Sequence, residues 1–426
     1  MSNPQSGGGP APDRDPRPAP GARSAVHSLL QERDFLRVWV AGGLGGTVRW
    51  LETLAVGVYT LAATGSAFTV ALMLFARAAP TALFGAFAGA VAERVPRLVV
   101  LRAGLATMVL VAGGLAVLAH SGRLALWHVA LGAFLNGTFF SLEFPARRTM
   151  VAEIAGLARV GTAMSLDSAT NNATRMLGPL LGGFLFASLG LAGAYVLSAS
   201  LYLGAFLALV GLRFRPAAPS AAGTAMLAIV REGVAYIRLN RLVAGTLVVT
   251  LLVNLFGFAY SSMVPVIGER RLALGPAEIG VLMSMEGLGA LIGSIAVALG
   301  VRASWFTRVY SGGSALFLAM ITGFSLCAVY PLAMVALALA GLGIAGFSTM
   351  QSTIVLSATE PRMRARVMGV LLVCIGAGPV GVLHVGLLAE WLGAAAAVRT
   401  IAIEGLVALG LTLWRWPELL RPPPRP

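Results

Sequence analysis

The sequence lacks lysine altogether and is poor in charged residues of both signs. Only 11% of its 426 residues are charged, against 58% hydrophobic ones, and all 31 basic residues are arginines. The mean hydropathy of +0.85 is too high for a water-soluble chain, because one core could not bury so many apolar side chains. This composition excludes a soluble enzyme and a disordered chain, and it predicts an all-α integral membrane protein.

Cysteine, histidine and catalytic motifs are also scarce. The two cysteines, Cys327 and Cys374, lie in apolar runs without the spacing of metal ligands, and the four histidines are scattered. The sequence contains no H-E-x-x-H, no G-x-S-x-G and no phosphate-binding P-loop. We therefore expect no disulfide framework, no metal site, no cofactor, no enzymatic activity and no self-contained ATP-driven pump.

The apolar runs are long enough for about twelve membrane-spanning helices, since about 20 apolar residues cross a bilayer as a helix. The first six are expected near residues 37–62, 66–91, 98–119, 124–144, 162–188 and 191–212. The second six are expected near residues 242–266, 279–300, 308–328, 331–356, 367–389 and 394–415.

Polar stretches divide the chain into five predicted regions. Two six-helix bundles are flanked and joined by polar segments: a disordered tail over 1–30, a bundle over 31–212, a linker over 213–241, a bundle over 242–415 and a tail over 416–426. Within the linker, apolar residues recur at helical spacing over 225–239, which predicts an amphipathic helix on the membrane surface.

The net charge of +14 has a topological explanation. If both termini are cytoplasmic, about 24 arginines fall in cytoplasmic segments, and only Arg123, Arg270 and Arg271 fall outside. Positive charge accumulates in this way on the cytoplasmic side of membrane proteins. The sequence therefore indicates a multi-pass protein of the bacterial cytoplasmic (inner) membrane with cytoplasmic termini, and it argues against a nucleic-acid partner.

Two motifs point to a family. The chain reads Gly89-Ala-Val-Ala-Glu93-Arg94-Val-Pro-Arg97 between the second and third predicted spans, and Gly178-Pro179-Leu-Leu-Gly182-Gly183 in the fifth. The first resembles the G-x-x-x-D-R-x-G-R loop signature of the major facilitator superfamily, and the second resembles the G-P-x-x-G-G signature of its exporters. Other segments, such as Arg33–Trp39 and Pro361–Met368, resemble the branch of drug and siderophore effluxers that contains the enterobactin exporter.

The resemblance implies a major facilitator fold of two pseudo-symmetric six-helix bundles. It implies that the glycines of the fifth span pack against the eighth span, and that Glu93 lies at the start of the eleventh span beside Arg364 and Arg366. The chain departs from the family in that the predicted fourth span, 124–144, lacks the membrane-embedded arginine of many drug/proton antiporters. Their coupling chemistry therefore cannot be copied onto this chain.

Ionisable side chains within the predicted spans are candidates for function, since each costs about 2.5–3.5 kcal/mol on insertion scales. Arg49 and Glu52 lie three residues apart on one face of the first span, and Arg77 reaches a comparable depth in the second. We expect Glu52 to pair alternately with Arg49 or Arg77 and to carry a proton in one conformation. A static ion pair that only joins two helices stays open as the alternative.

A polar stripe runs along the fifth predicted span, where Asp167, Asn171 and Arg175 follow at spacing four. In the C-terminal half, polar candidates for lining the cavity are few, and Glu286 and His384 are expected to lie close enough to pair. These C-terminal candidates are Asn254, Glu286, Gln351 and His384.

Together these features predict a monomeric secondary transporter whose partners are the lipid bilayer and a small-molecule substrate. Arginines and aromatic residues around a cavity would suit an anionic, partly apolar drug or siderophore. We expect export by alternating access, with the proton motive force as the energy source. Import of a small metabolite and flipping of lysophospholipid stay open as alternatives.

Overall fold

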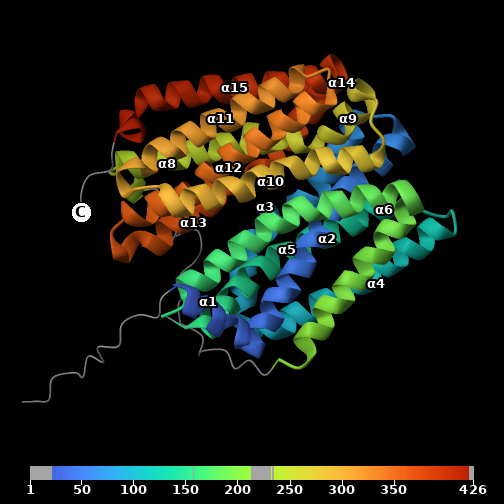
Figure 1. The fold of residues 1–426 in the computed structure, drawn as a ribbon, viewed down its shortest axis with the longest axis horizontal. Helices are drawn as coiled ribbons and strands as arrows, with labels where there is room; N and C mark the ends of the chain where they lie inside the picture. Colours follow the sequence, from blue (N-terminus) through green and yellow to red (C-terminus); the bar gives the residue numbers. More distant parts are fainter. Residues whose placement is uncertain (1–21, 157, 213–231, 233–234, 422–426) are drawn as a thin grey trace, which may run out of the picture.

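The computed structural model describes residues 22–156, 158–212, 232 and 235–421, which form helices and, within these ranges, no strand. Figure 1 shows two helical bundles side by side, one from the N-terminal half (blue to green) and one from the C-terminal half (yellow to red). The helices of the N-terminal half are α1 (Ala22–Gln31), α2 (Arg33–Thr64), α3 (Ala67–Arg94), α4 (Arg97–His120), α5 (Leu126–Ala155) and α6 (Val160–Val210).

The C-terminal half contains both regular α-helices and shorter turns of other helix types. Its longer helices are α8 (Arg241–Leu252), α9 (Val264–Leu272), α10 (Pro276–Gly300), α11 (Phe306–Leu326), α12 (Tyr330–Ser357), α13 (Arg364–Ile375), α14 (Gly378–Leu392) and α15 (Ala394–Arg415). The short turns are η1 (Val253–Gly257), η2 (Phe258–Ser262), η3 (Ala303–Trp305), η4 (Pro361–Met363) and η5 (Pro417–Leu420).

Each predicted span falls on helical residues of the described chain, within a few residues at the ends. The 51 residues of α6 are too many for one span, and the chain turns back at Gly190, whose φ of 64° suits glycine. Two predicted spans are interrupted: α8 passes through a π-helical turn at η1, and the span over 367–389 breaks before Pro379. Proline explains the second break, because it cannot donate the next helical hydrogen bond.

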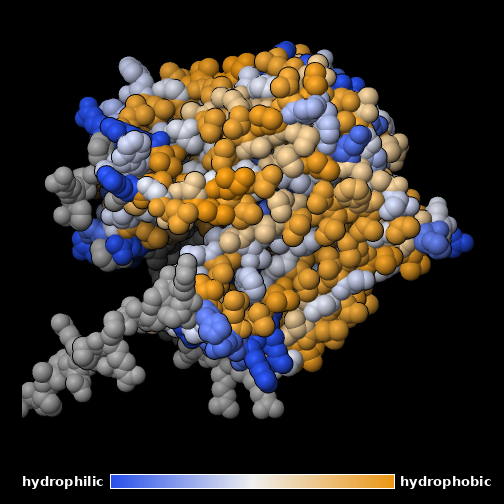
Figure 2. Space-filling view, in the orientation of Figure 1, coloured by the Kyte–Doolittle hydropathy of each residue, from blue (hydrophilic) through white to orange (hydrophobic). Residues whose placement is uncertain are grey.

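The outer surface confirms that lipid is the solvent of this protein. By length and composition, 8 helices of the described chain are long and apolar enough to cross a membrane, with α6 counted once. Large apolar side chains such as Leu110 (76% exposed) and Leu411 (61% exposed) face outward, and Figure 2 shows apolar residues over both halves. A bilayer removes the cost that water would impose on such a surface.

The two halves meet along α6 and α10 and along α3 and α14. A Cβ atom added to Gly280 would lie 2.5 Å from the carbonyl oxygen of Pro179, and one added to Gly183 would lie 2.6 Å from that of Pro276. Gly183 therefore makes the contact with the eighth span that the family resemblance implies. Gly178 and Gly182 face α2 instead, so one motif serves two packing seams.

The N-terminal end of the chain corrects one prediction of disorder. Residues 22–30, predicted to be disordered, belong to α1, where Leu29 is fully buried and Glu32 just beyond the helix pairs with Arg159 at 2.7 Å. The predicted tail beyond residue 415 begins with η5, which buries Leu419.

The C-terminal turn is also fixed by charge. Arg241 donates to the Glu418 carboxylate at 2.6 Å, and this hydrogen bond lowers the pKa of Glu418.

The predicted amphipathic helix over 225–239 lies mostly outside the described residues. Its last residues are helical, and the backbone N–H of Glu360 donates to the Tyr236 hydroxyl at 3.3 Å.

We predict that Gly183→Val weakens the seam between the halves. The added side chain must displace the backbone of α10, and overpacking of this kind costs about 1–3 kcal/mol of stability. Thermal unfolding in detergent measures the loss. The matched control is Gly312→Val in α11, where an added Cβ meets no atom of the described chain within 4 Å; equal losses in both variants would contradict the assignment.

Candidate functional site

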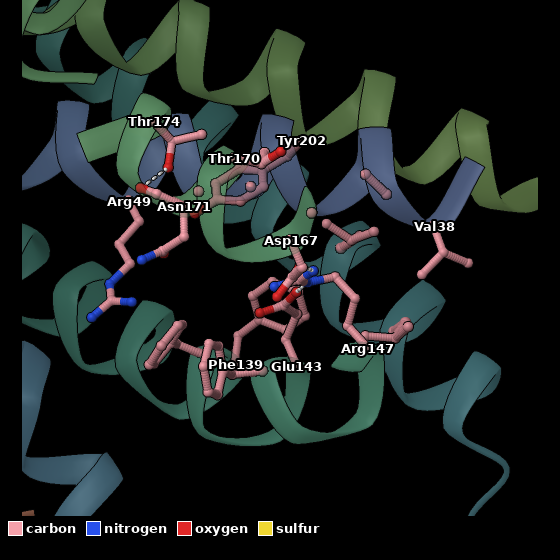
Figure 3. Close-up of a pocket in the computed structure, with 18 of the residues that line it drawn as sticks. Val38, Arg49, Phe139, Glu143, Arg147, Asp167, Thr170, Asn171, Thr174 and Tyr202 are labelled. Carbon is pink, nitrogen blue, oxygen red and sulfur yellow. Dashed lines mark hydrogen bonds and ion pairs between the residues drawn. The ribbon is translucent and has the colours of Figure 1, made fainter. Parts of the chain in front are cut away.

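A cavity of about 50 Å³ opens within the N-terminal bundle between α2, α4, α5 and α6, with room for a few water molecules (Figure 3). Its charged and polar lining comes from the first, fourth, fifth and sixth predicted spans and from Arg147 just beyond the fourth. These lining residues are Arg49, Asn136, Glu143, Arg147, Asp167, Thr170, Asn171, Thr174 and Tyr202.

Arg49 points into this cavity and forms no ion pair within 4.0 Å among the described residues, although the Glu143 carboxylate on the cavity wall attracts it at longer range (Figure 3). Its guanidinium lies over the ring of Phe140, 3.7 Å from the centroid, and 5.4 Å from that of Trp50. Arg49 and Glu52 do not pair in this structure, and their alternation in another conformation stays a prediction. The two side chains share a helix face, but Glu52 turns toward partners on α3 and α5.

Glu52 is buried behind the cavity wall, with 7% of its surface exposed. Asn136 Nδ2 donates to Glu52 Oε2 at 3.0 Å, and Arg77 Nη1 lies 4.0 Å from the same oxygen. Arg77 also donates to the carbonyl oxygen of Arg49 at 2.7 Å. The predicted pairing of Glu52 with Arg77 is thus present as a loose contact, while Asn136 makes the closer one.

A buried charge cluster occupies the other end of the cavity (Figure 3). Asp167 accepts hydrogen bonds from Arg147 and from Arg148, the latter at 2.9 Å, and Arg147 also donates to Glu143 at 2.6 Å. Both arginines lie beyond the predicted end of the fourth span at residue 144 and were not among the predicted site residues. The structure continues α5 to Ala155, and this extension places Arg147 in the cavity wall.

A second buried ion pair joins the two halves. Arg175 in α6 donates to Glu286 in α10, and its guanidinium lies 4.8 Å from the ring centroid of Trp50. Glu286 therefore pairs with Arg175 in this structure and not with His384, the partner that the sequence had suggested. His384 lies 3.7 Å from Glu404 in α15 instead, because this side of α14 faces α15 and not α10.

Residues 24–418 match the model of a family described as transmembrane secretion effector. The chain belongs to this major facilitator family. The match confirms the resemblance read from the loop and helix motifs, and it agrees with the absence of catalytic motifs from the sequence: this is a multi-pass membrane transporter and not an enzyme.

Several curated relatives and solved structures are similar to this transporter. The Staphyloferrin A transporter of Staphylococcus aureus is 23% identical over 368 residues, covering 85% of this chain and 91% of that protein. The multidrug efflux pump Tap of Mycolicibacterium fortuitum is 27% identical over 311 residues, covering 69% and 74%. The fold is that of a POT family transporter solved with 5-aminolevulinic acid, with a TM-score of 0.73 at 10% identity over 92% and 97% of the two chains.

The other predicted site residues of this transporter are dispersed. Asn171 lines the cavity, whereas Asn254 and Gln351 are buried in the C-terminal half and do not line it. Asn254 donates to the carbonyl oxygen of Thr250 one turn earlier, at 2.9 Å. The structure thus places Arg49, Asp167 and Asn171 around one cavity, and it pairs Glu286 of the C-terminal half with Arg175 away from that cavity.

The loop motif of the transporter lies at the end of α3. Gly89, Glu93 and Arg94 belong to a stretch whose side chains are outside the described residues, so the expected contact of Glu93 with Arg364 and Arg366 stays a prediction. Arg97 pairs with Glu153 at 2.5 Å and joins the start of α4 to the end of α5. Arg366 pairs with Glu232 of the linker at 2.9 Å.

Four residues that complete the site were not selected from the sequence. They line the same cavity as the predicted candidates. These residues are Asn136, Glu143, Arg147 and Tyr202. The first three lie at spacings of seven and four on α5, which places them on one helix face. That spacing was a readable signal, whereas nothing in the sequence indicated that Tyr202 faces it.

We predict that Glu286→Gln leaves the buried Arg175 without a counter-ion and costs about 3–5 kcal/mol of stability. The double variant R175M/E286L should recover most of that loss, because it removes both charges. Chemical denaturation in detergent checks both values. Glu360→Gln is the control, since its exposed pair with Arg362 is worth about 0–1 kcal/mol; a single variant as stable as this control would exclude the buried pair.

Proposed function

We propose that this transporter exports a small anionic, partly apolar molecule across the bacterial cytoplasmic membrane in exchange for protons. One observation carries the proposal: a cation without a close ion pair, Arg49, faces a cavity, and a buried carboxylate, Glu52, lies directly behind the wall of that cavity. A substrate anion and a proton would then be bound by neighbouring groups of one helix.

The chemistry of the cavity supports an anionic substrate. Asp167 is already shared by two arginines, whereas the close contacts of the Arg49 guanidinium are aromatic rings, which stabilise a cation less than a paired carboxylate does. Phe139 and Phe140 add apolar surface on the same wall. A molecule with a carboxylate or phenolate joined to an aromatic or aliphatic body could bind both the Arg49 guanidinium and the apolar surface of the phenylalanines.

The names of two relatives suggest two classes of substrate for this transporter. The Staphyloferrin A transporter and the multidrug efflux pump Tap are named for a siderophore and for drugs. An acidic siderophore would supply the negative charge that could pair with Arg49, and an amphipathic drug has the apolar body that the phenylalanines would contact. We infer that the cargo of this transporter belongs to one of these classes.

The position of Glu52 supports proton coupling. Its carboxylate is buried, is hydrogen-bonded by a neutral amide and lies 4.0 Å from Arg77 rather than in tight contact with it. A change in the spacing of α2, α3 and α5 would alter that balance, and with it the free energy of protonation. Rocking of the halves about the seams of α6 provides such a change.

The proposed direction of transport rests on the arginine distribution and on the glycine-proline motif of α6. The arginine distribution favours cytoplasmic termini, and Gly178, Pro179, Gly182 and Gly183 form the motif that the family resemblance associates with export. The transporter would load its cargo from the cytoplasm and release it outside while a proton enters.

We predict that Glu52→Gln abolishes proton-driven transport and leaves substrate binding measurable. Inside-out vesicles with an acidic lumen are tested for accumulation of siderophores, drugs and lysophospholipid, with and without the pH gradient. The wild type and the control Glu360→Gln should accumulate an anionic drug or siderophore only with the gradient. Gradient-driven accumulation in the Glu52→Gln vesicles would refute the proton role, and accumulation of lysophospholipid alone would favour a flippase.

We predict that Arg49→Leu weakens binding of the anionic substrate by about 10- to 100-fold, since a charge-assisted hydrogen bond contributes about 1.5–3 kcal/mol. Arg49→Lys, which retains the charge, should lose less. Equilibrium binding to purified protein measures both effects, with the exposed Arg362→Leu as the control. Unchanged affinity in Arg49→Leu would remove the anion site from the proposal.

A further inference from the structure

A second, smaller cavity lies behind the first, and Glu52 forms part of its wall. It has a volume of about 10 Å³, close to the space that one water molecule needs. Most of its lining is apolar and comes from α2, α4 and α5: Val56, Met108, Val111, Ala112, Leu115 and Ala133. We call it the inner chamber, and the cavity of Figure 3 the outer cavity.

Two side chains belong to the walls of both spaces. Among the described residues that line them, only Asn136 and Tyr202 are common to the inner chamber and the outer cavity. Asn136 Nδ2 donates to Tyr202 Oη at 2.5 Å and to Glu52 Oε2 at 3.0 Å. The partition between the spaces is therefore a hydrogen-bonded pair that also holds the carboxylate.

The chemistry of this partition decides how a proton can pass. The Asn136 amide uses both of its N–H groups in these bonds and does not itself exchange protons readily at neutral pH. The Tyr202 hydroxyl accepts from Asn136, so its own hydrogen is free to donate to water on either side. A proton from the outer cavity reaches Glu52 only if the Asn136–Glu52 bond opens and water replaces it.

The polar groups near Glu52 are few among the described residues. α4 contributes apolar side chains to the inner chamber, the polar contribution of α5 is Asn136, and the buried Ser198 hydroxyl of α6 also lies near the carboxylate. The charged and titratable groups around the carboxylate come from α3, α6 and the preceding turn of α2: Arg77, Tyr195, Tyr202 and Arg49.

The partition is mechanically linked to the place where a substrate would bind. Tyr202 packs edge-on against Phe139, with ring centroids 6.5 Å apart, and Phe139 lines the outer cavity. The next residue, Phe140, lies under the Arg49 guanidinium. A ligand seated against Arg49 would contact the helix that carries Asn136 and could shift it by the small distance that breaks a hydrogen bond.

We propose that Asn136 and Tyr202 form an internal gate which admits protons to Glu52 only when the outer cavity is occupied. The inference rests on the proposed proton role of Glu52 and adds how proton entry depends on substrate. Asn136 acts as a positioning residue, because it holds the carboxylate and fills the passage. The gate prevents protons from leaking through the protein while no cargo is bound.

Proton entry into proteoliposomes that contain a pH-sensitive dye tests this gate. Without substrate, an imposed gradient should acidify wild-type vesicles slowly, and substrate should speed the entry. Asn136→Leu should raise the substrate-free rate about tenfold and make it independent of substrate. Tyr202→Phe, which preserves the ring, should lower the substrate-stimulated rate at least threefold, because it removes the hydroxyl that donates to water.

Two further variants distinguish the gate from the proposed proton-carrying role of Glu52. Ser141→Ala removes a buried hydrogen-bonding group of α5 that lines neither space, and it should match the wild type. The double variant E52Q/N136L should lose the leak, since the path ends on Glu52. A leak that persists in the double variant would overturn the gate.

The remaining outcomes are also decisive. Wild-type rates and substrate dependence in both Asn136→Leu and Tyr202→Phe would overturn the gate, while a loss of coupling in Glu52→Gln would still support the proposed function. Retained coupling in Glu52→Gln would refute the proton role itself. If Asn136→Leu does not fold, the Tyr202→Phe measurement decides alone, because that change removes one oxygen and keeps the packing.

Discussion

A charged side chain at bilayer depth must be neutralised by its neighbours, because neither water nor lipid can do so cheaply. In this transporter the requirement explains the main polar contacts between helices. Asp167 lies between two arginines, Glu286 neutralises Arg175 across the halves, and Glu52 is held by an amide. Arg49 is the informative exception, since its described contacts are aromatic rings.

α6 connects these features mechanically. Its first turns carry Asp167, the acidic residue that it contributes to the cavity, the following turns carry Arg175, and its glycines pack against α2 on one side and α10 on the other. A small rotation of one half against the other therefore acts on the cavity and on the ion pair together. Close packing without side chains allows such sliding, because glycine seams contain few interlocking groups.

Much of the fold could be predicted from the sequence, because lipid imposes a simple length and polarity rule on each span. The same rule selected Glu52, Arg77 and Asp167, which are costly wherever they point. It did not select Arg147, because this arginine lies beyond the predicted end of its span, where topology alone accounts for a positive charge. The extra turns of α5 that draw Arg147 inward depend on packing against α6, which the sequence does not display.

Composition and periodicity alone determined that the chain crosses the membrane, how its spans are spaced and which charges lie deep, because each of these is a property of one segment in its solvent. The partners of those charges were decided by the tertiary structure. His384 faces Glu404 and not Glu286, Arg49 turns away from Glu52, and Asn136 meets Tyr202 across 66 residues. Such choices depend on the rotation of each helix about its own axis, which only the packing of all its neighbours fixes.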